Sequence, residues 1–316
     1  MATNIWFWII FNLFVLGLLA LDLGVFHRKA HSVSVKEAAI WSAIWISLSL
    51  AFNYGLYLVM GKEIALQFLA GYLIEKSLSV DNIFVFIMLF GFFQVPSEYQ
   101  HRVLFWGILG ALIMRGALIG AGAFLIAQFH WVLYVFGAFL VYTGIRMALQ
   151  KETDTIDVES NRAVKLLRRF FPITNGYRGQ KFFSVENGVR MATPLLVVLV
   201  IVETTDLIFA LDSIPAIFAV TQDAFIVYTS NVFAILGLRA LYFLLAGVMQ
   251  SFRYLKYGLS LVLAFVGVKM LIADLYHMPI ALSLGVIAAI LTLSILASLL
   301  VPMPKEAAAP AGDGIG

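Results

Sequence analysis

Nine long apolar segments constrain this sequence more than any other feature. Each holds about the 20 mostly apolar residues that a helix needs to cross a lipid bilayer. The predicted spans are 5–25, 38–60, 64–93, 103–127, 131–149, 194–220, 223–248, 255–275 and 279–301. A membrane β-barrel would instead have short segments of alternating polarity. The sequence therefore predicts an all-α polytopic membrane protein with nine transmembrane helices.

The composition excludes a soluble fold of this size. Apolar residues make up 62% of the 316 residues and charged residues only 12%, against about 45–50% and about 25% in soluble domains. The net charge of +3 does not indicate nucleic-acid binding, because most basic residues lie in short loops beside apolar segments. The chain contains no cysteine, which excludes disulfides, thiolate metal sites and cysteine catalysis.

The basic residues alternate between loops, and this alternation predicts the orientation. One set of loops, together with the C-terminal tail, carries 15 of the 21 Lys and Arg residues, whereas the alternate set carries only Lys62. Cytoplasmic loops are the ones enriched in Lys and Arg. We therefore expect the N-terminus outside and the C-terminus in the cytoplasm.

The predicted organisation follows the order of the chain. The units are two helices in 1–60, three helices in 61–149, a cytoplasmic loop in 150–193, three helices in 194–275, a ninth helix in 276–301 and a disordered tail in 302–316.

The long cytoplasmic loop is predicted to contain two small elements. Val164, Leu167 and Phe170 fall on one helical face beside basic residues, which is typical of a short interfacial helix. Asn187 and Gly188 lie between apolar stretches, which predicts a β-hairpin turn. A structured linker is favoured over a regulatory element for this loop.

Three matches in the same order indicate an internal repeat. The equivalent positions are Glu75 and Asp206, Asp81 and Asp212, Asn82 and Ser213, Arg115 and Arg239, and the segments Gly144 to Met147 and Gly267 to Met270. Each unit has three helices, an odd number, so the second copy must enter the membrane from the opposite side. Helices 3–5 and 6–8 are therefore predicted to be inverted repeats, which in transporters meet around a substrate site near the midplane.

Five carboxylates lie within two of the predicted spans, where charge is costly. They are Glu75, Asp81, Glu203, Asp206 and Asp212. Each costs about 2.5–3.5 kcal/mol at a helix centre on insertion scales, so a bound cation, a basic partner or protonation must offset it. The ligand interpretation is favoured for these five, and structural ion pairing is the alternative. Weaker ligand candidates are Asn82 and Ser213, and candidates for charge balance are Arg115, Arg239 and Lys76.

The candidate ligand atoms are all oxygens, because the five histidines lie in loops or at span ends. Such sites suit Mg²⁺, Ca²⁺ or Mn²⁺, and the residues alone leave the choice open. A six-residue step turns a helix by about 240°, so Glu75 and Asp81 cannot share one face of a straight helix. Pro215 predicts a kink or break in the sixth span, which would free backbone carbonyls to join the site.

The acidic segments resemble the two signature stretches of the TerC family. These are Gly71 to Val85 and Val202 to Val220, and Ser230 to Leu245 also resembles that family. The resemblance covers about residues 5–301 and points to the Alx branch. It implies a bacterial inner-membrane protein of manganese homeostasis that exports Mn²⁺ and is linked to alkaline pH. It also implies that the same five acids are the positions that matter.

Two functional hypotheses follow. The first is an Mn²⁺ exporter that works by alternating access against protons, with the five acids exchanging Mn²⁺ for H⁺. The second is a membrane scaffold for assembly or metalation of exported proteins, as some relatives in the family suggest, with the 150–193 loop as the docking surface.

We expect no enzyme, no bound cofactor and no nucleic-acid partner. An intramembrane aspartyl protease would need a Gly-x-Gly-Asp-like sequence within a span, and the nearest similar sequence, around Asp313, lies in the tail. The expected partners are a divalent cation as transported substrate, protons and membrane lipid. The sequence leaves the oligomeric state open.

Overall fold

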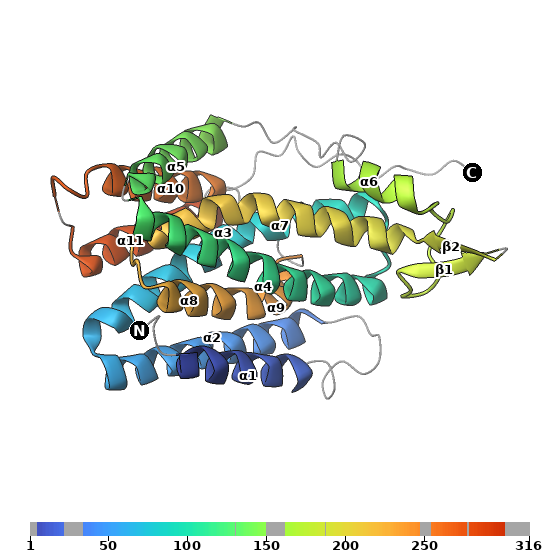
Figure 1. Cartoon of the computed structure of the whole chain (residues 1–316), viewed down its shortest axis with the longest axis horizontal. Helices are drawn as coiled ribbons and strands as arrows, with labels where there is room; N and C mark the ends of the chain where they lie inside the picture. The colour runs from blue at the N-terminus through green and yellow to red at the C-terminus, as the bar shows by residue number, and fades with distance from the viewer. Residues whose placement is uncertain are drawn as a thin grey trace.

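Figure 1 shows a bundle of long helices with a small β-hairpin at one end. The computed structural model describes residues 5–21, 34–129, 131–149, 162–186, 188–246, 254–276 and 278–300. The elements are α1 (Ile5–Leu21), α2 (Val35–Met60), α3 (Lys62–Phe92), α4 (Ser97–Gln128), α5 (Val132–Leu149), α6 (Arg162–Phe170), β1 (Phe183–Glu186), β2 (Val189–Ala192), α7 (Pro194–Phe218), α8 (Ala224–Leu236), α9 (Leu238–Ala246), α10 (Leu255–Leu271) and α11 (Ile280–Leu300). The predicted disordered tail, 302–316, lies outside the described residues.

The structure is that of an all-α membrane protein, because most of its helices are long and apolar. Among the described residues, α2, α4, α5, α7 and α11 are long and apolar enough to cross a bilayer, and α8 with α9 makes a sixth when this bent pair is counted as one span. The 31-residue α3 is long enough but carries five charged residues. The helices α1 and α10 have 17 residues each, somewhat fewer than the usual span.

The break in the helices lies at Gly237, not where Pro215 predicts it. Pro215 lies in the last turn of α7, which is continuous through it, and there the missing N–H removes only one bond near the helix end. Instead α8 and α9 meet at Gly237 with a bend of 41°. The Nζ of Lys76 donates to the carbonyl oxygen of Ala234 at 3.3 Å, which satisfies a carbonyl at the end of α8. A Cβ on Gly237 would lie 2.7 Å from the same Nζ.

The two predicted three-helix units pack against each other reciprocally. Helix α3 packs on α8 and α4 packs on α7, while α3 and α7 pack together and so do α5 and α10. The α5–α10 contact is close because Gly137 and Gly267 face each other, and Gly144 faces the backbone of Ser260 and Ala264. Two units related by a two-fold axis would produce such reciprocal packing.

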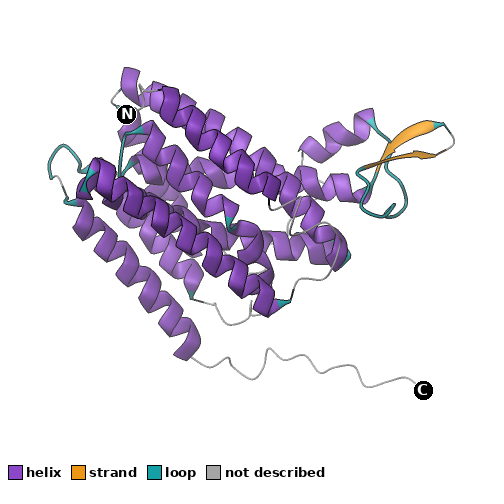
Figure 2. Ribbon diagram, turned by 90° about the horizontal axis from the view of Figure 1, so that it is seen from below, coloured by secondary structure: helices purple, strands orange, loops and turns teal. Residues whose placement is uncertain are grey.

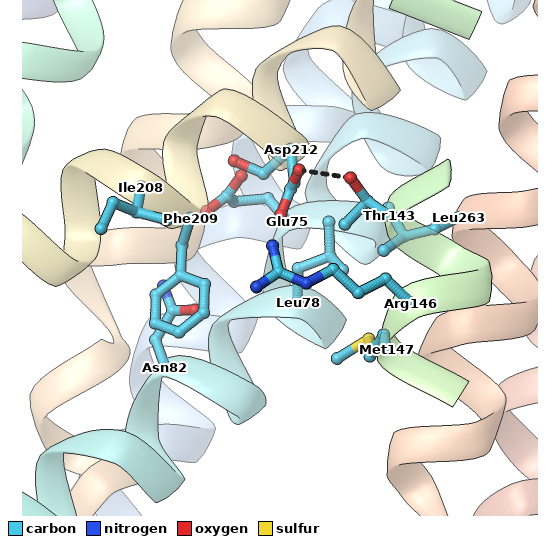
Figure 3. A pocket seen from close by; sticks show the side chains of 11 residues that line it. Glu75, Leu78, Asn82, Thr143, Arg146, Met147, Ile208, Phe209, Asp212 and Leu263 are labelled. Carbon is cyan, nitrogen blue, oxygen red and sulfur yellow. Dashed lines mark hydrogen bonds between the residues drawn. The ribbon is translucent and has the colours of Figure 1, made fainter. Parts of the chain in front are cut away.

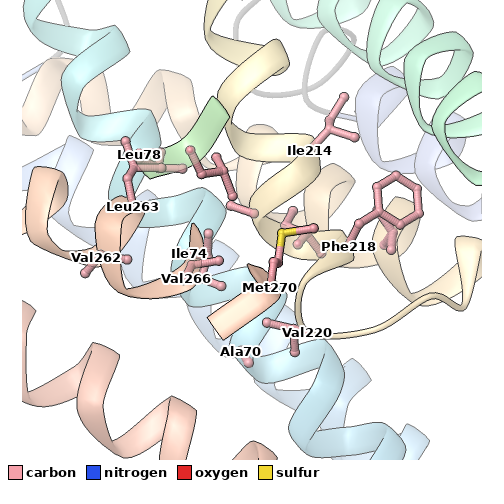
Figure 4. Packing of buried hydrophobic residues seen from close by; sticks show 14 of the residues in the cluster. Ala70, Ile74, Leu78, Ile214, Phe218, Val220, Val262, Leu263, Val266 and Met270 are labelled. Carbon is pink, nitrogen blue, oxygen red and sulfur yellow. The ribbon is translucent and has the colours of Figure 1, made fainter. Parts of the chain in front are cut away.

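Apolar clusters fill the space between the helices. Figure 4 shows part of a cluster that includes Ile74 of α3, Ile214 of α7 and Val266 of α10. A second cluster is rich in aromatic residues and joins α1 and α2 to α3 and α8. The third lies between α3, α4, α7 and α9 and includes Val164 of α6. These clusters enclose the polar residues of the candidate site.

The loop between α5 and α7 contains both predicted elements in its described part. Strands β1 and β2 form an antiparallel hairpin that projects from the bundle (Figure 2), and Gly188 in its turn has φ +78°. In α6, Val164 is buried against α7, whereas Phe170 is 67% exposed. Tyr177 anchors this loop by donating to the Phe93 carbonyl at 2.8 Å, and burial raises the pKa of its hydroxyl.

Candidate functional site

A buried arginine on α4 joins acids from two helices. Nη2 of Arg115 donates to Oδ1 of Asp206 at 2.7 Å, and Nε donates to Oδ2 at 3.1 Å. Nη1 of Arg115 donates to Glu75 on α3. All three side chains are buried, with 0–3% exposure, and charges at this depth require such partners. Glu75 and Asp206, equivalent positions of the predicted repeat, therefore share one guanidinium.

Neutral side chains complete the hydrogen bonds of this network. Nδ2 of Asn231, on α8, donates to Oε2 of Glu75 at 3.0 Å, and Nδ2 of Asn82 donates to Oδ1 of Asp206 at 3.4 Å. Arg115 also donates to the hydroxyl of Ser213 at 3.3 Å. The network thus connects α3, α4, α7 and α8.

A cavity of about 210 Å³ lies beside this network, between α3, α5, α7 and α10. Its polar lining residues are Glu75, Asn82, Thr143, Arg146, Asp212 and Ser213. Oγ1 of Thr143 donates to Oδ1 of Asp212 at 3.1 Å, and Figure 3 shows the Arg146 side chain extending into the cavity toward the acids. Oδ1 of Asn82 is buried and has no hydrogen-bond partner in the described part of the chain. The cavity therefore presents carboxylate, hydroxyl and amide oxygens.

The structure brings together some of the five predicted acids but not all. Glu75 and Asp206 meet at Arg115, and Glu75 and Asp212 line the cavity. Glu203 lies elsewhere, against Gly110 of α4. Asp81 belongs to α3, but its side chain is outside the described part of the structure. Among the described residues, no three His, Asp or Glu side chains form a group that could hold a metal ion.

The three candidates for charge balance have different surroundings. Arg115 binds two of the acids directly. Arg239 and Asp206 line a separate, small cavity of about 10 Å³. Lys76 donates to a backbone carbonyl rather than to an acid.

Sequence reasoning missed Asn231 and Thr143 as site residues. Asn231 contacts both Glu75 and Arg115, and Thr143 contacts Asp212. The sequence signal for each was a polar side chain within an apolar span, and Asn231 also lies in the segment Ser230 to Leu245 that resembles the family.

Comparison with known proteins gives the family. The family model described as "Integral membrane protein TerC family" matches residues 60–306. The chain belongs to the TerC family. The TerC match begins at the end of α2 and includes every acid and arginine of the site described above.

Three similar proteins cover almost the whole chain. An uncharacterized membrane protein of Myxococcus xanthus is 56% identical over 97% of this chain and 94% of its own length. Proteins of Salmonella typhi and Escherichia coli strain K12, both named "Putative membrane-bound redox modulator Alx", are each 53% identical over 90% of this chain and 91% of their own length. These likenesses agree with the expected Alx branch of TerC. No solved structure matches the chain.

Proposed function

We propose that this TerC protein exports a divalent metal cation, Mn²⁺, from the bacterial cytoplasm across the inner membrane in exchange for protons. The observation that carries the proposal is the cavity of about 210 Å³ within the helix bundle, which Asp212 and Glu75 line. Carboxylate, hydroxyl and amide oxygens suit Mn²⁺ as well as Mg²⁺ and Ca²⁺. Oδ1 of Asn82, which has no hydrogen-bond partner among the described residues, supplies a further ligand atom at the cavity wall.

Glu75 is the acid that we expect to change partners during transport. A guanidinium stays charged in proteins, so Arg115 needs a carboxylate throughout the cycle. Asp206 meets this need with two hydrogen bonds from Arg115. Glu75 forms an ion pair with Arg115 and also lines the cavity. Its carboxylate can therefore turn from the guanidinium to a cation held by Asp212 and Asn82.

Arg146 acts in this scheme as a built-in competitor of the cation. Its side chain enters the cavity on the side of the acids (Figure 3). A positive charge there repels a bound divalent cation and attracts the same carboxylates. Displacement of Arg146 on binding, and its return on release, would limit how long the cation stays.

For the architecture we propose nine spans, an outside N-terminus and two inverted repeats, helices 3–5 and 6–8. The reciprocal packing of α3 on α8 and of α4 on α7 supports this. Further support is that one guanidinium binds the equivalent residues Glu75 and Asp206. Asp81 would then face Asp212 from α3 as the equivalent ligand.

The name of the Alx relatives refers to redox modulation. This chain has no cysteine, so a redox role would not use a thiol of its own, and the function that we propose is transport.

A scaffold that assists assembly or metalation of exported proteins is the second candidate function. The projecting hairpin favours it, because Val185 is 71% exposed and Val189 51% exposed at its tip. In the hairpin register Val185 pairs with Arg190 and Val189 with Glu186, so one apolar side chain is exposed on each face of the hairpin.

Cation flux into proteoliposomes tests the proposal. Purified wild-type protein should move Mn²⁺, and a panel of Mn²⁺, Mg²⁺ and Ca²⁺ ranks the substrates. Asp212→Asn should abolish the flux at wild-type abundance, because Asn retains an oxygen for the Thr143 hydroxyl but loses the charge. Asp223→Asn is the matched control, since Asp223 caps α8 through Phe225 N and Asn caps helices as well as Asp does.

The scaffold hypothesis predicts the opposite result. Wild-type protein that inserts into vesicles and moves no divalent cation would overturn the transport proposal. A fully active Asp212→Asn variant would overturn the role of the cavity.

A further inference from the structure

Glu203 does not face the cavity that Asp212 lines. The two acids are nine positions apart on α7. This step is about two and a half helical turns, so their side chains leave the helix on opposite sides. The lining of the cavity accordingly includes Asp212 but not Glu203. Glu203 therefore belongs to a different part of the molecule from the proposed cation ligands.

The carboxyl group of Glu203 occupies space that a glycine on α4 leaves open. A Cβ on Gly110 would lie 2.1 Å from Oε1 and 2.5 Å from Oε2 of Glu203. No side chain other than hydrogen fits at position 110 unless Glu203 moves. The contact between α4 and α7 is thus shaped around this one carboxyl group.

Among the described residues, Glu203 has few partners for an ionised carboxylate, and its side chain is partly buried. Its Oε2 is buried without a hydrogen-bond partner in the described part of the chain. No salt bridge reaches Glu203 within the same residues. A buried charge without partners is strongly unfavourable, whereas a neutral carboxyl group is tolerated much better.

One charged neighbour, Asp206, also favours the neutral form of Glu203. Asp206 lies one turn further along the same face of α7, and a second negative charge beside it is unfavourable. Arg115 of α4 is bound to Asp206 and Glu75. Arg239 of α9 shares with Asp206 a cavity of about 10 Å³, which has room for about one water molecule.

We propose that Glu203 is a proton-binding residue separate from the cation cavity, and that it carries a proton exchanged for the cation. This inference rests on the proposed transport function. The carboxylate accepts one proton to become a neutral carboxyl group against Gly110, and it returns that proton on the other side of the membrane. Asp206 connects Glu203 to the cation cavity. It lies one turn from Glu203 and is joined through Arg115 to Glu75, which lines the cavity.

Glu203→Gln in full-length protein in proteoliposomes tests the proposal. Gln keeps the size and one oxygen but cannot take up a proton. We expect Mn²⁺/Mn²⁺ exchange to persist, while proton counterflow and proton-driven Mn²⁺ accumulation are lost. Loss of Mn²⁺ exchange would make Glu203 a ligand and overturn the proposal, as would unaltered proton-driven accumulation.

A second pair of variants tests the geometry. Gly110→Ala should push the carboxyl group away from its site and weaken proton coupling. Gly120→Ala, also on α4, is the matched control, because its Cβ would have no neighbour within 4 Å. Equal coupling in both variants would contradict the role of the Glu203–Gly110 contact.

Infrared spectroscopy tests the protonation independently of transport. At neutral pH the wild-type protein should have a carboxylic acid C=O band that Glu203→Gln lacks. Absence of this difference would overturn the protonation of Glu203 even in an active transporter. Its presence in a protein that moves no cation would retain the protonation of Glu203 but refute its role in exchange together with the transport function.

Discussion

Arg115 has more negative partners than one positive charge can neutralise. It binds both Glu75 and Asp206. The second acid is tolerated because Asn231 and Ser79 also donate hydrogen bonds to Glu75, and such bonds stabilise a carboxylate. Removal of Arg115 therefore affects two helices at once.

Arg115→Met should destabilise the protein by about 3–5 kcal/mol, because it leaves two buried acids without their cation. Thermal unfolding in detergent, followed by circular dichroism, measures the loss. The matched control is Arg178→Met, which removes the exposed 2.7 Å contact between Arg178 and Glu186 and should cost at most about 1 kcal/mol. A wild-type melting temperature for Arg115→Met would exclude a structural role for the contacts of Arg115 with Glu75 and Asp206.

At the scale of single residues, the sequence predicts several residues of the site. It does not predict which of them contact one another. Intramembrane acids are conspicuous because they are costly, so Glu75, Asp206 and Asp212 could be predicted. The sharing of Arg115 by Glu75 and Asp206 depends on how four helices pack, which no local pattern encodes. The separation of Glu203 from Asp212 was available from helix periodicity alone, since it follows from the nine-position step between them.

The position of the helix break depends on contacts between elements. Helices occur in all the predicted apolar segments, and the hairpin lies at its predicted turn. The break differs, because Pro215 lies too close to the end of α7 to interrupt it. Gly237 marks the break instead, where Lys76 from the distant α3 binds the carbonyl of Ala234. A residue far away in the sequence thus satisfies a carbonyl beside the break, and no local pattern predicts this contact.

Gly144→Ala should destabilise the contact between α5 and α10. The added Cβ would lie 2.7 Å from the Ser260 carbonyl oxygen and 2.9 Å from the Ala264 nitrogen. Backbone atoms cannot move aside as a side chain can, so the two helices must separate, at about 1–3 kcal/mol. Melting temperature measures the effect, with Gly120→Ala as the control that meets no neighbour. Equal melting of the two variants would argue against a tight contact.

The whole molecule should have all its basic loops on one side of the membrane. A reporter fused after Gln150 should report the cytoplasm, and one fused after Gly61 should report the outside, because Lys and Arg favour the cytoplasmic face. Cysteine labelling offers an independent measurement, since the chain has no native cysteine. An external signal after Gln150 would reverse the orientation and remove the basis for the inverted repeats.

The acids and guanidinium groups around the cavity determine how transport should respond to the membrane voltage. Among the described side chains, the three carboxylates of Glu75, Asp206 and Asp212 and the two guanidinium groups of Arg115 and Arg146 leave one net negative charge when all are ionised. A bound divalent cation reverses the sign of that charge. Moving one unit charge across the membrane field is worth about 2.3 kcal/mol per 100 mV. When Glu203 gives up its proton in the loaded form, its own negative charge makes that form neutral, so an imposed potential should act mainly on the half of the cycle in which the cavity is empty.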